Sequence, residues 1–277
     1  MNTQAHAAPL VLIGCGKMGG AMLSGWLAGG EASGGVHVVE PNADATASFS
    51  ERDEVTVHNA IDDLPANLTP SVVILAVKPQ SMDDAVTPLA RFTKTGTCFL
   101  SIAAGKTIGY FEKHLGSEAA IVRAMPNTPA AVGRGITAYV ANDRVDAEQK
   151  AFCHRLLESV GEALEADEEG WIDAVTALSG GGPAYVFLLI EALAKAGEAS
   201  GLPADFAMRL ARATVSGSGE LARQSKEDAS QLRVNVTSPG GTTAEALKVL
   251  MDEKTGIQPV FDAAIAAATA RSKELAG

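Results

Sequence analysis

The sequence predicts an α/β N-terminal domain with a doubly wound parallel sheet, followed by an all-α C-terminal domain. Its 277 residues exceed the size at which a single hydrophobic core grows comfortably. In the first half, short runs of β-branched residues alternate with helical stretches, which is typical of a parallel sheet covered by helices on both faces. After about residue 167 the strand-like runs disappear and alanine-rich helical ones dominate. We therefore place the domains at residues 1–166 and 167–277.

The regular elements follow from these patterns in chain order. Strands are expected at residues 10–13, 36–39, 71–76, 97–102, 120–123 and 136–140. Helices are expected in the second half at residues 185–200, 204–224, 244–253 and 259–275. These helices are apolar over much of their circumference, which fits either the interior of a monomer or burial against a second subunit. We favour the second interpretation and expect self-association as a dimer.

Composition and charge narrow the classes of function. The formal net charge of -11 argues against nucleic acid as a partner, because that binding depends on clustered Lys and Arg. Residues 1–9 do not fit a secretory signal, and no uninterrupted apolar stretch approaches the ~20 residues that span a bilayer. The three cysteines are far apart, and no His, Cys, Asp and Glu cluster has metal-ligand spacing. We expect a cytoplasmic protein that binds a small molecule and neither a metal nor a membrane.

A glycine-rich motif of the form G-x-G-x-x-G comes directly after the first predicted strand and opens a helix. It consists of Gly14, Cys15, Gly16, Lys17, Met18 and Gly19. The first glycine permits a tight turn, the second lets a pyrophosphate approach the backbone, and the third allows close packing of helix and strand. The helix N-terminus adds amide donors and a positive dipole. The motif therefore predicts a Rossmann-type dinucleotide site, in which Cys15 is a small turn residue rather than a reactive thiol.

Glu40 ends the second predicted strand, about 20 positions after Gly19, where an acidic residue accepts hydrogen bonds from the adenosine ribose. This position favours NAD over NADP. Asn42 and the nearby backbone are still able to receive a 2′-phosphate, so both NADPH and NADH stay open as cofactors.

Three further strand ends carry small or polar residues at the carboxyl edge of the sheet, where open α/β sheets bind their ligands. They contribute Ala76, Val77, Lys78 and Pro79, then Ala103, Ala104 and Gly105, and then Met125, Pro126 and Asn127. Lys78 is expected near the cofactor, and the small residues of the second loop would let a nicotinamide ring lie close. The third loop carries two prolines and is rigid, so it serves either as a positioning loop or as a plain structural turn.

Two glycine-rich segments open helices in the second half. One runs from Ser179 through three glycines to Tyr185. The other contains Thr237, Ser238, Pro239, Gly240, Gly241, Thr242 and Thr243. Its unpaired amides and hydroxyls suit a carboxylate, and they exceed what a simple N-cap requires.

Five segments resemble the pyrroline-5-carboxylate reductase family in order and spacing, over almost the whole chain. They are residues 14–19, 76–79, 123–130, 179–185 and 236–243. The resemblance implies a helical domain that interlocks with its twin, with dimers assembled into a larger ring. Position by position, it implies that Asn59 joins the cofactor-binding residues named above, and that Glu169, Asn235, Thr242 and Thr243 line the substrate side. Asn127 and Asn235 also count as cofactor contacts. This chain departs from the pattern at Gly181, where serine is common, at Val234, where an acid is usual, and at Glu40.

The expected reaction is hydride transfer from NADPH or NADH to the C=N carbon of 1-pyrroline-5-carboxylate. The substrate carboxylate would lie on Gly240, Gly241, Thr242 and Thr243, supported by Met125, Pro126, Ser179 and Ser238. Thr243 and Lys78 are the expected catalytic residues. Two other functions stay open: a 3-hydroxyacid dehydrogenase-like oxidoreductase, for which Lys195 is the candidate acid or base, and a non-catalytic dinucleotide sensor. Lys195 lacks the asparagine that follows the lysine of such dehydrogenases, and the carboxylate cradle argues against a sensor.

Overall fold

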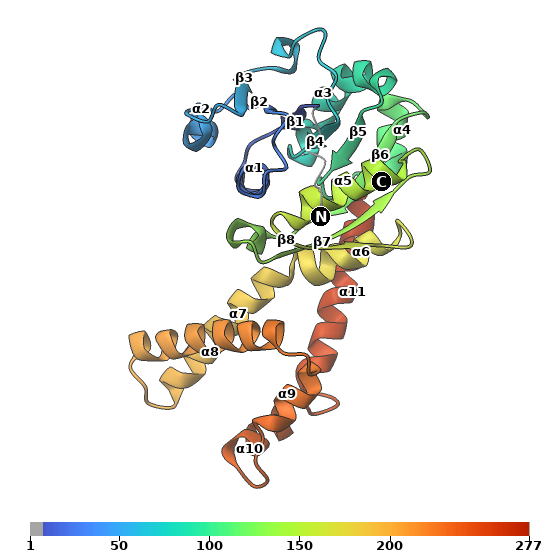
Figure 1. Ribbon diagram of the computed structural model, residues 1–277. Helices are drawn as coiled ribbons and strands as arrows, with labels where there is room; N and C mark the ends of the chain where they lie inside the picture. The colour runs from blue at the N-terminus through green and yellow to red at the C-terminus, as the bar shows by residue number, and fades with distance from the viewer. Residues whose placement is uncertain (1–7, 277) are drawn as a thin grey trace. The chain divides into compact units, whose positions relative to one another are not determined.

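The computed structural model describes residues 8–276 and contains two compact units (Figure 1). The first unit runs up to Gly180 and also includes the chain from Thr269 on, and the second is Gly181–Ala268. The expected domain boundary between residues 166 and 167 stays a prediction. Each unit is described by itself.

The first unit is built on one sheet. Within residues 8–276 it has eight strands in the order β3-β2-β1-β4-β5-β6-β7-β8. Their bounds are β1 Leu10–Ile13, β2 Val36–Val39, β3 Val55–His58, β4 Val72–Leu75, β5 Cys98–Ser101, β6 Ala120–Met125, β7 Gly135–Ala141 and β8 Gly161–Glu165. All six predicted strands are present, and β3 and β8 are the two that the sequence patterns did not indicate.

The sheet is parallel from β3 to β6, but β7 runs antiparallel to β6. The expected doubly wound parallel sheet is confirmed for these six strands, and the direction of β7 is the departure from it. Residues 126–134 join the two strands and are too few for a parallel crossover, which takes about a dozen residues or more. β8 then pairs parallel with β7 and extends the sheet.

Helices cover both faces of this sheet, as expected for a doubly wound domain. Those of the first unit are α1 Lys17–Gly29, α2 Ala43–Thr46, α3 Met82–Val86, α4 Ile108–Leu115, α5 Ala147–Glu158 and α6 Trp171–Val175, with the end of α11. Short 3-10 helices are η1 Ala47–Phe49, η2 Ile61–Asp63, η3 Pro79–Ser81, η4 Thr87–Thr95 and η5 Thr128–Val132, and η6 Thr176–Gly180 is a π-helical turn.

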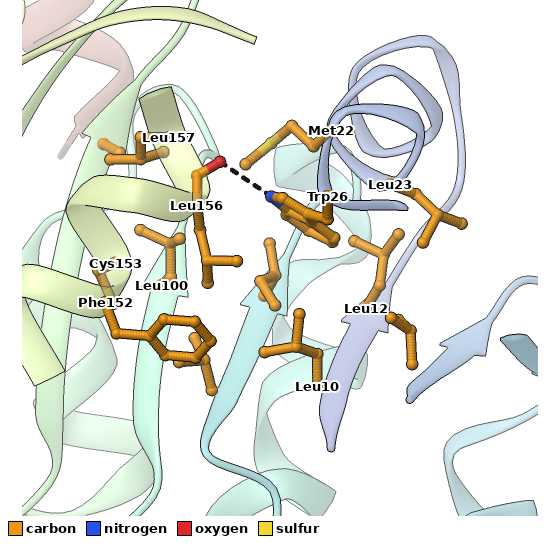
Figure 2. Close-up of a cluster of buried hydrophobic side chains, with 14 of the residues drawn as sticks. Leu10, Leu12, Met22, Leu23, Trp26, Leu100, Phe152, Cys153, Leu156 and Leu157 are labelled. Atoms are coloured by element: carbon orange, nitrogen blue, oxygen red, sulfur yellow. Dashed lines mark hydrogen bonds between the residues drawn. The ribbon is translucent and has the colours of Figure 1, made fainter. Parts of the chain in front are cut away.

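Each face of the sheet has its own hydrophobic core. On one face α1 and α5 pack over Leu10 and Leu12, and the buried Trp26 indole donates a hydrogen bond to the Leu156 carbonyl at 2.8 Å (Figure 2). On the other face α3, η4 and α4 pack over Val11 and Ile13. Because successive strand residues enter opposite cores, the central strands are apolar throughout, which explains the continuous runs in the sequence.

The second unit consists of helices joined by loops, and no strand occurs among its described residues. Its helices are α7 Gly182–Ala199, α8 Ala204–Gln224, α9 Ala229–Asn235, α10 Thr242–Leu250 and most of α11, Ile257–Ala276. The predicted helix at residues 204–224 has the bounds of α8, and the other three predicted helices match α7, α10 and α11 with ends shifted by a few residues. α9 was not predicted. α7 and α8 follow each other in the chain and pack against each other (Figure 1).

Many large apolar side chains of these helices are exposed in the single chain. They include Val186, Phe187, Leu188, Leu189, Phe206, Leu210, Val260 and Phe261. The helical stretch Trp171–Ala199 is also long and apolar enough to cross a membrane, by length and composition alone. Exposed apolar surface of this extent marks a place where another molecule binds.

Candidate active site

The glycine-rich loop lies between β1 and α1, and each of its three glycines has a different structural role. Gly14 has φ +92°, and a Cβ there would lie 2.9 Å from the Ala76 carbonyl oxygen. A Cβ at Gly19 would collide with the Gly14 carbonyl oxygen, so helix and loop pack closely only because this residue has no side chain. Gly16 has nothing within 4 Å of its missing Cβ. That open space over a helix N-terminus fits the approach of a pyrophosphate.

A cavity of about 490 Å³ opens at the carboxyl ends of β1, β2 and β4. Its lining includes seven of the residues that we expect to bind the cofactor: Gly14, Gly16, Glu40, Asn59, Ala76, Val77 and Lys78. The fold therefore brings together residues from four separate loops that the sequence places up to 64 positions apart, from Gly14 to Lys78. The lining is small and largely apolar, with few polar groups, as cofactor sites generally are.

A second hollow of about 460 Å³ lies along the glycine loop and is lined by Cys15, Gly16 and Lys17. Met18 and Gly19 line neither hollow: Met18 packs against the core and Gly19 against the loop. Burial, and then the neighbouring Glu40 charge, raises the pKa of the Cys15 thiol to about 11. The thiol is therefore protonated at neutral pH, which agrees with its interpretation as a small turn residue.

The Glu40 carboxylate is held by backbone amides at the edge of the first cavity. Oε2 accepts a hydrogen bond from the Cys15 amide at 2.9 Å, and Oε1 accepts one from the Asn42 amide at 3.0 Å. The Asn42 side chain itself caps α2 by accepting from the Asp44 amide at 3.1 Å. The hydrogen bonds of Asn42 thus order the turn after β2. This turn fixes the position of the Glu40 carboxylate.

Two other strand ends present the remaining expected cofactor residues of the first unit. Lys78 and Pro79 are exposed at the end of the β4 loop. After β5, the Ala103 amide donates to the Ser101 hydroxyl at 3.2 Å, which orders the turn that leads to Ala104 and Gly105. Gly105 has φ +72°, and a Cβ there would lie 3.1 Å from the Leu275 carbonyl oxygen. The end of α11 therefore accounts for this glycine without a ligand.

The loop after β6 is tied to backbone groups. The Asn127 side chain accepts from the Ile136 amide at 2.9 Å and donates to the Ser179 carbonyl at 3.1 Å. The Ser179 hydroxyl donates to the Val175 carbonyl at 3.1 Å. In the first unit by itself, Asn127 and Ser179 thus hold Met125 and Pro126 in place.

A buried ion pair was missed by the sequence reasoning. Arg123 is 3% exposed, and its Nη1 lies 2.7 Å from Oε1 of Glu169, which also accepts from the Ile108 amide at 2.8 Å. Arg123 Nε has no hydrogen-bond partner among the described residues. Glu169, expected at the substrate side, therefore joins β6 to the first turn of α4. The available signal was a charged residue inside the apolar strand Ala120–Met125, since a buried arginine requires an acidic partner.

In the second unit, the segment that we expect to bind a carboxylate leads into the start of α10. Gly240 has φ +69°, Gly241 is the N-cap, and no side chain caps the helix. Thr242 and Thr243 are exposed in its first turn, where amides have no acceptor within the helix. The Asn235 side chain accepts from Gln231 at 2.8 Å and donates to Glu227 at 3.0 Å. Ser238 accepts from the Gly241 amide through its carbonyl at 3.0 Å and shapes the turn.

Comparisons with known proteins agree with this architecture. Residues 169–275 match the model for pyrroline-5-carboxylate reductase dimerisation, and residues 9–105 match that for NADP oxidoreductase, coenzyme F420-dependent. A pyrroline-5-carboxylate reductase of Pseudomonas aeruginosa is 38% identical over 267 residues, which are 96% of each chain.

Two solved structures extend the comparison to three dimensions. A pyrroline-5-carboxylate reductase from Coxiella burnetii has a TM-score of 0.90 and 36% identity, with 98% of this chain and 100% of that chain covered. A Plasmodium falciparum pyrroline carboxylate reductase with NADP bound has a TM-score of 0.79 and 29% identity, with 98% of each chain covered. The extent of these matches, the dinucleotide cavity and the helical region together show that the chain belongs to the pyrroline-5-carboxylate reductase family.

Proposed function

We propose that this chain catalyses the NAD(P)H-dependent reduction of 1-pyrroline-5-carboxylate to L-proline, the last step of proline biosynthesis. The observation that carries the proposal is the presence, in one chain, of a dinucleotide cavity and of the family's helical region, at 38% identity to a named reductase over 96% of both chains. The alternatives of a hydroxyacid dehydrogenase and of a dinucleotide sensor have no comparable support.

The residues of the first cavity hold the cofactor. Gly14 and Gly16 leave the backbone amides of the loop accessible to the pyrophosphate, and Glu40 accepts from the adenosine ribose. Among the described residues that line the cavity, Lys78 is the one cation, and it orients the bound dinucleotide. The bound cofactor supplies the hydride, from nicotinamide C4 to the imine carbon. The protein chiefly binds and orients both molecules.

The residues at the start of α10 bind the substrate carboxylate. The amides of Thr242 and Thr243 lie in a first turn where they have no acceptor within the helix, and the dipole of a nine-residue helix favours a negative charge there. The Thr243 hydroxyl accepts a hydrogen bond from the protonated ring nitrogen, so a substrate that binds as an iminium brings its own proton. Residues expected to complete this side are Met125, Pro126, Glu169, Ser179, Asn235 and Ser238.

The helical unit forms the subunit interface. Its exposed apolar side chains would be covered by those of a second copy, which also accounts for the apolar stretch Trp171–Ala199 without a membrane. The proposed assembly is a dimer, extended to a ring of dimers, in the cytoplasm.

The test is imine-dependent oxidation of NADH and NADPH, followed by the loss of reduced-nicotinamide absorbance with 1-pyrroline-5-carboxylate. A 3-hydroxy acid with NAD and NADP is the matched control for the reverse reaction. Oxidation that depends on the imine supports the proposal. Turnover of the hydroxy acid without turnover of the imine would move the chain to the dehydrogenase alternative.

A further inference from the structure

We propose that Glu40 makes this chain prefer NADH over NADPH. The inference rests on the proposed function and deepens it, because it concerns which cofactor the same cavity takes. It depends on three features of the first unit: how the carboxylate is held, which charges surround it, and where the available cations lie.

The Glu40 carboxylate is fixed before any ligand arrives. Its two oxygens accept from the amides of Cys15 and Asn42, at 2.9 and 3.0 Å, and the Glu40 amide donates to the His58 carbonyl at 3.0 Å. Hydrogen bonds from amides to a carboxylate are among the stronger ones in proteins. Each carboxylate oxygen still has capacity for a further hydrogen bond, which two ribose hydroxyls can supply. To admit a phosphate at the ribose 2′ position, the side chain would have to leave both amides.

The charges around Glu40 are also unfavourable for a phosphate. The cavity lining includes two acids, Glu40 and Asp84, against the single cation Lys78. No Lys or Arg occurs between Glu40 and Arg52, whereas this segment contains Asp44 and Glu51. A phosphate monoester carries about two negative charges near neutral pH. In NADP-binding sites of this fold, an arginine close to the end of the second strand normally pairs with the 2′-phosphate.

Lys78 and Arg52 do not occupy that place, and Lys17 lines the neighbouring hollow and not this cavity. Lys78 follows β4, and β1 lies between β4 and β2, so the ends of β2 and β4 are two strand spacings apart, about 10 Å. Arg52 precedes β3, which runs parallel to β2, and it therefore lies toward the amino edge of the sheet, opposite the cavity. Asn59, which follows β3 and lines the cavity, is neutral. The adenosine end of the cavity therefore presents a fixed negative charge with no compensating positive one among the described lining residues.

The family itself does not dictate this preference, since the Plasmodium relative has NADP bound and the matched model for residues 9–105 is described for NADP. NADH preference is thus a property of particular residues in this chain. Glu40 favours NADH, whereas these two comparisons name NADP, so a measured cofactor preference decides between them.

The experiment measures the dissociation constants of NADH and NADPH by nucleotide fluorescence, together with kcat/KM for each in imine reduction. The unmodified chain should favour NADH by about tenfold or more, a typical discrimination from one misplaced polar group. Glu40→Ser should reduce that ratio by about tenfold through weaker NADH binding and tighter NADPH binding. Glu40→Gln, which keeps the shape and removes the charge, should reduce the ratio in the same direction.

The matched control is Asp53→Asn. It removes the same charge from an exposed side chain that precedes β3, toward the amino edge of the sheet, and that does not line the cavity. Its NADH to NADPH ratio should stay within about twofold of the unmodified chain. Equal or tighter binding of NADPH by the unmodified chain, or an unchanged ratio in both Glu40 variants, would overturn the inference. Absence of imine reduction with either cofactor would contradict the proposed function, while the two dissociation constants would still decide the role of Glu40.

Discussion

Thr243 lies in the first turn of α10 with its hydroxyl exposed and with no acceptor for its amide inside the helix. In the proposed reaction this residue contributes to substrate orientation and not to cofactor binding, because the imine nitrogen is the group that needs a hydrogen-bond partner. Its two functions, an amide for the carboxylate and a hydroxyl for the nitrogen, are separable by mutation.

Thr243→Ala should lower kcat by about tenfold to a hundredfold, in the range for loss of one positioned hydrogen-bonding group. The dissociation constant of NADH should stay within about twofold, because the helix amide and the cofactor cavity are unchanged. Steady-state kinetics and a fluorescence titration measure the two quantities. Thr243→Ser keeps the hydroxyl and should retain most of the activity; an alanine variant with full turnover would remove Thr243 from the mechanism.

Single residues differ in how far their roles can be predicted from sequence. The glycines of the first loop were predictable because their spacing reflects local geometry, namely a positive φ at Gly14 and close packing at Gly19. The partnership of Arg123 with Glu169 was not, since the two residues are 46 positions apart and only the folded sheet joins them. Gly105 was assigned to a nicotinamide, whereas the structure gives it a second reason to be glycine, the approach of Leu275.

At the scale of elements, α1 and α5 cover one face of the sheet, and the Trp26 side chain lies at the contact between these two helices. Trp26 is fully buried, and its indole donates to the Leu156 carbonyl at the last full turn of α5 (Figure 2). Gly25 allows the helices to approach, since a Cβ there would lie 2.8 Å from the Ser159 carbonyl oxygen. The first helix, whose N-terminus faces the proposed pyrophosphate site, is thus anchored at its far end.

Trp26→Phe should lower the free energy of unfolding by about 1–3 kcal/mol, because it leaves a cavity and deprives the Leu156 carbonyl of its indole donor. Urea unfolding followed by circular dichroism, at one protein concentration, measures the change. Val132, an apolar side chain of the first unit, is 74% exposed and provides the control: Val132→Ala should change stability by less than about 0.5 kcal/mol. Equal effects of the two substitutions would contradict the packing described here.

Elements were predictable where burial is complete and less so at the edges of the sheet. The central strands are apolar on both faces, so their runs stand out in the sequence. β3 and β8 are edge strands with exposed polar residues, as in the pattern Gly161–Glu165, and their runs do not stand out. The antiparallel β7 depends on the length of a connection and not on the composition of the strand.

At the scale of the whole molecule, the chain combines a folded nucleotide-binding unit with a helical unit that exposes much of its apolar surface. The first unit has a hydrophobic core on each face of its sheet. The helical unit was recognisable from the sequence by its alanine-rich, apolar helices, but its partner was not specified by them. A second copy of this chain fits that surface in the proposed assembly.

The central claim is that this chain transfers a hydride to the C=N carbon of a cyclic imine that carries a carboxylate. The most direct test is to incubate it with 1-pyrroline-5-carboxylate and NADH that carries deuterium at both C4 positions, and to analyse the product by mass spectrometry and NMR. We predict L-proline with a single deuterium at C5, the former imine carbon, since that position does not exchange with water after reduction. Proline without deuterium, or no proline with either NADH or NADPH, would contradict the account.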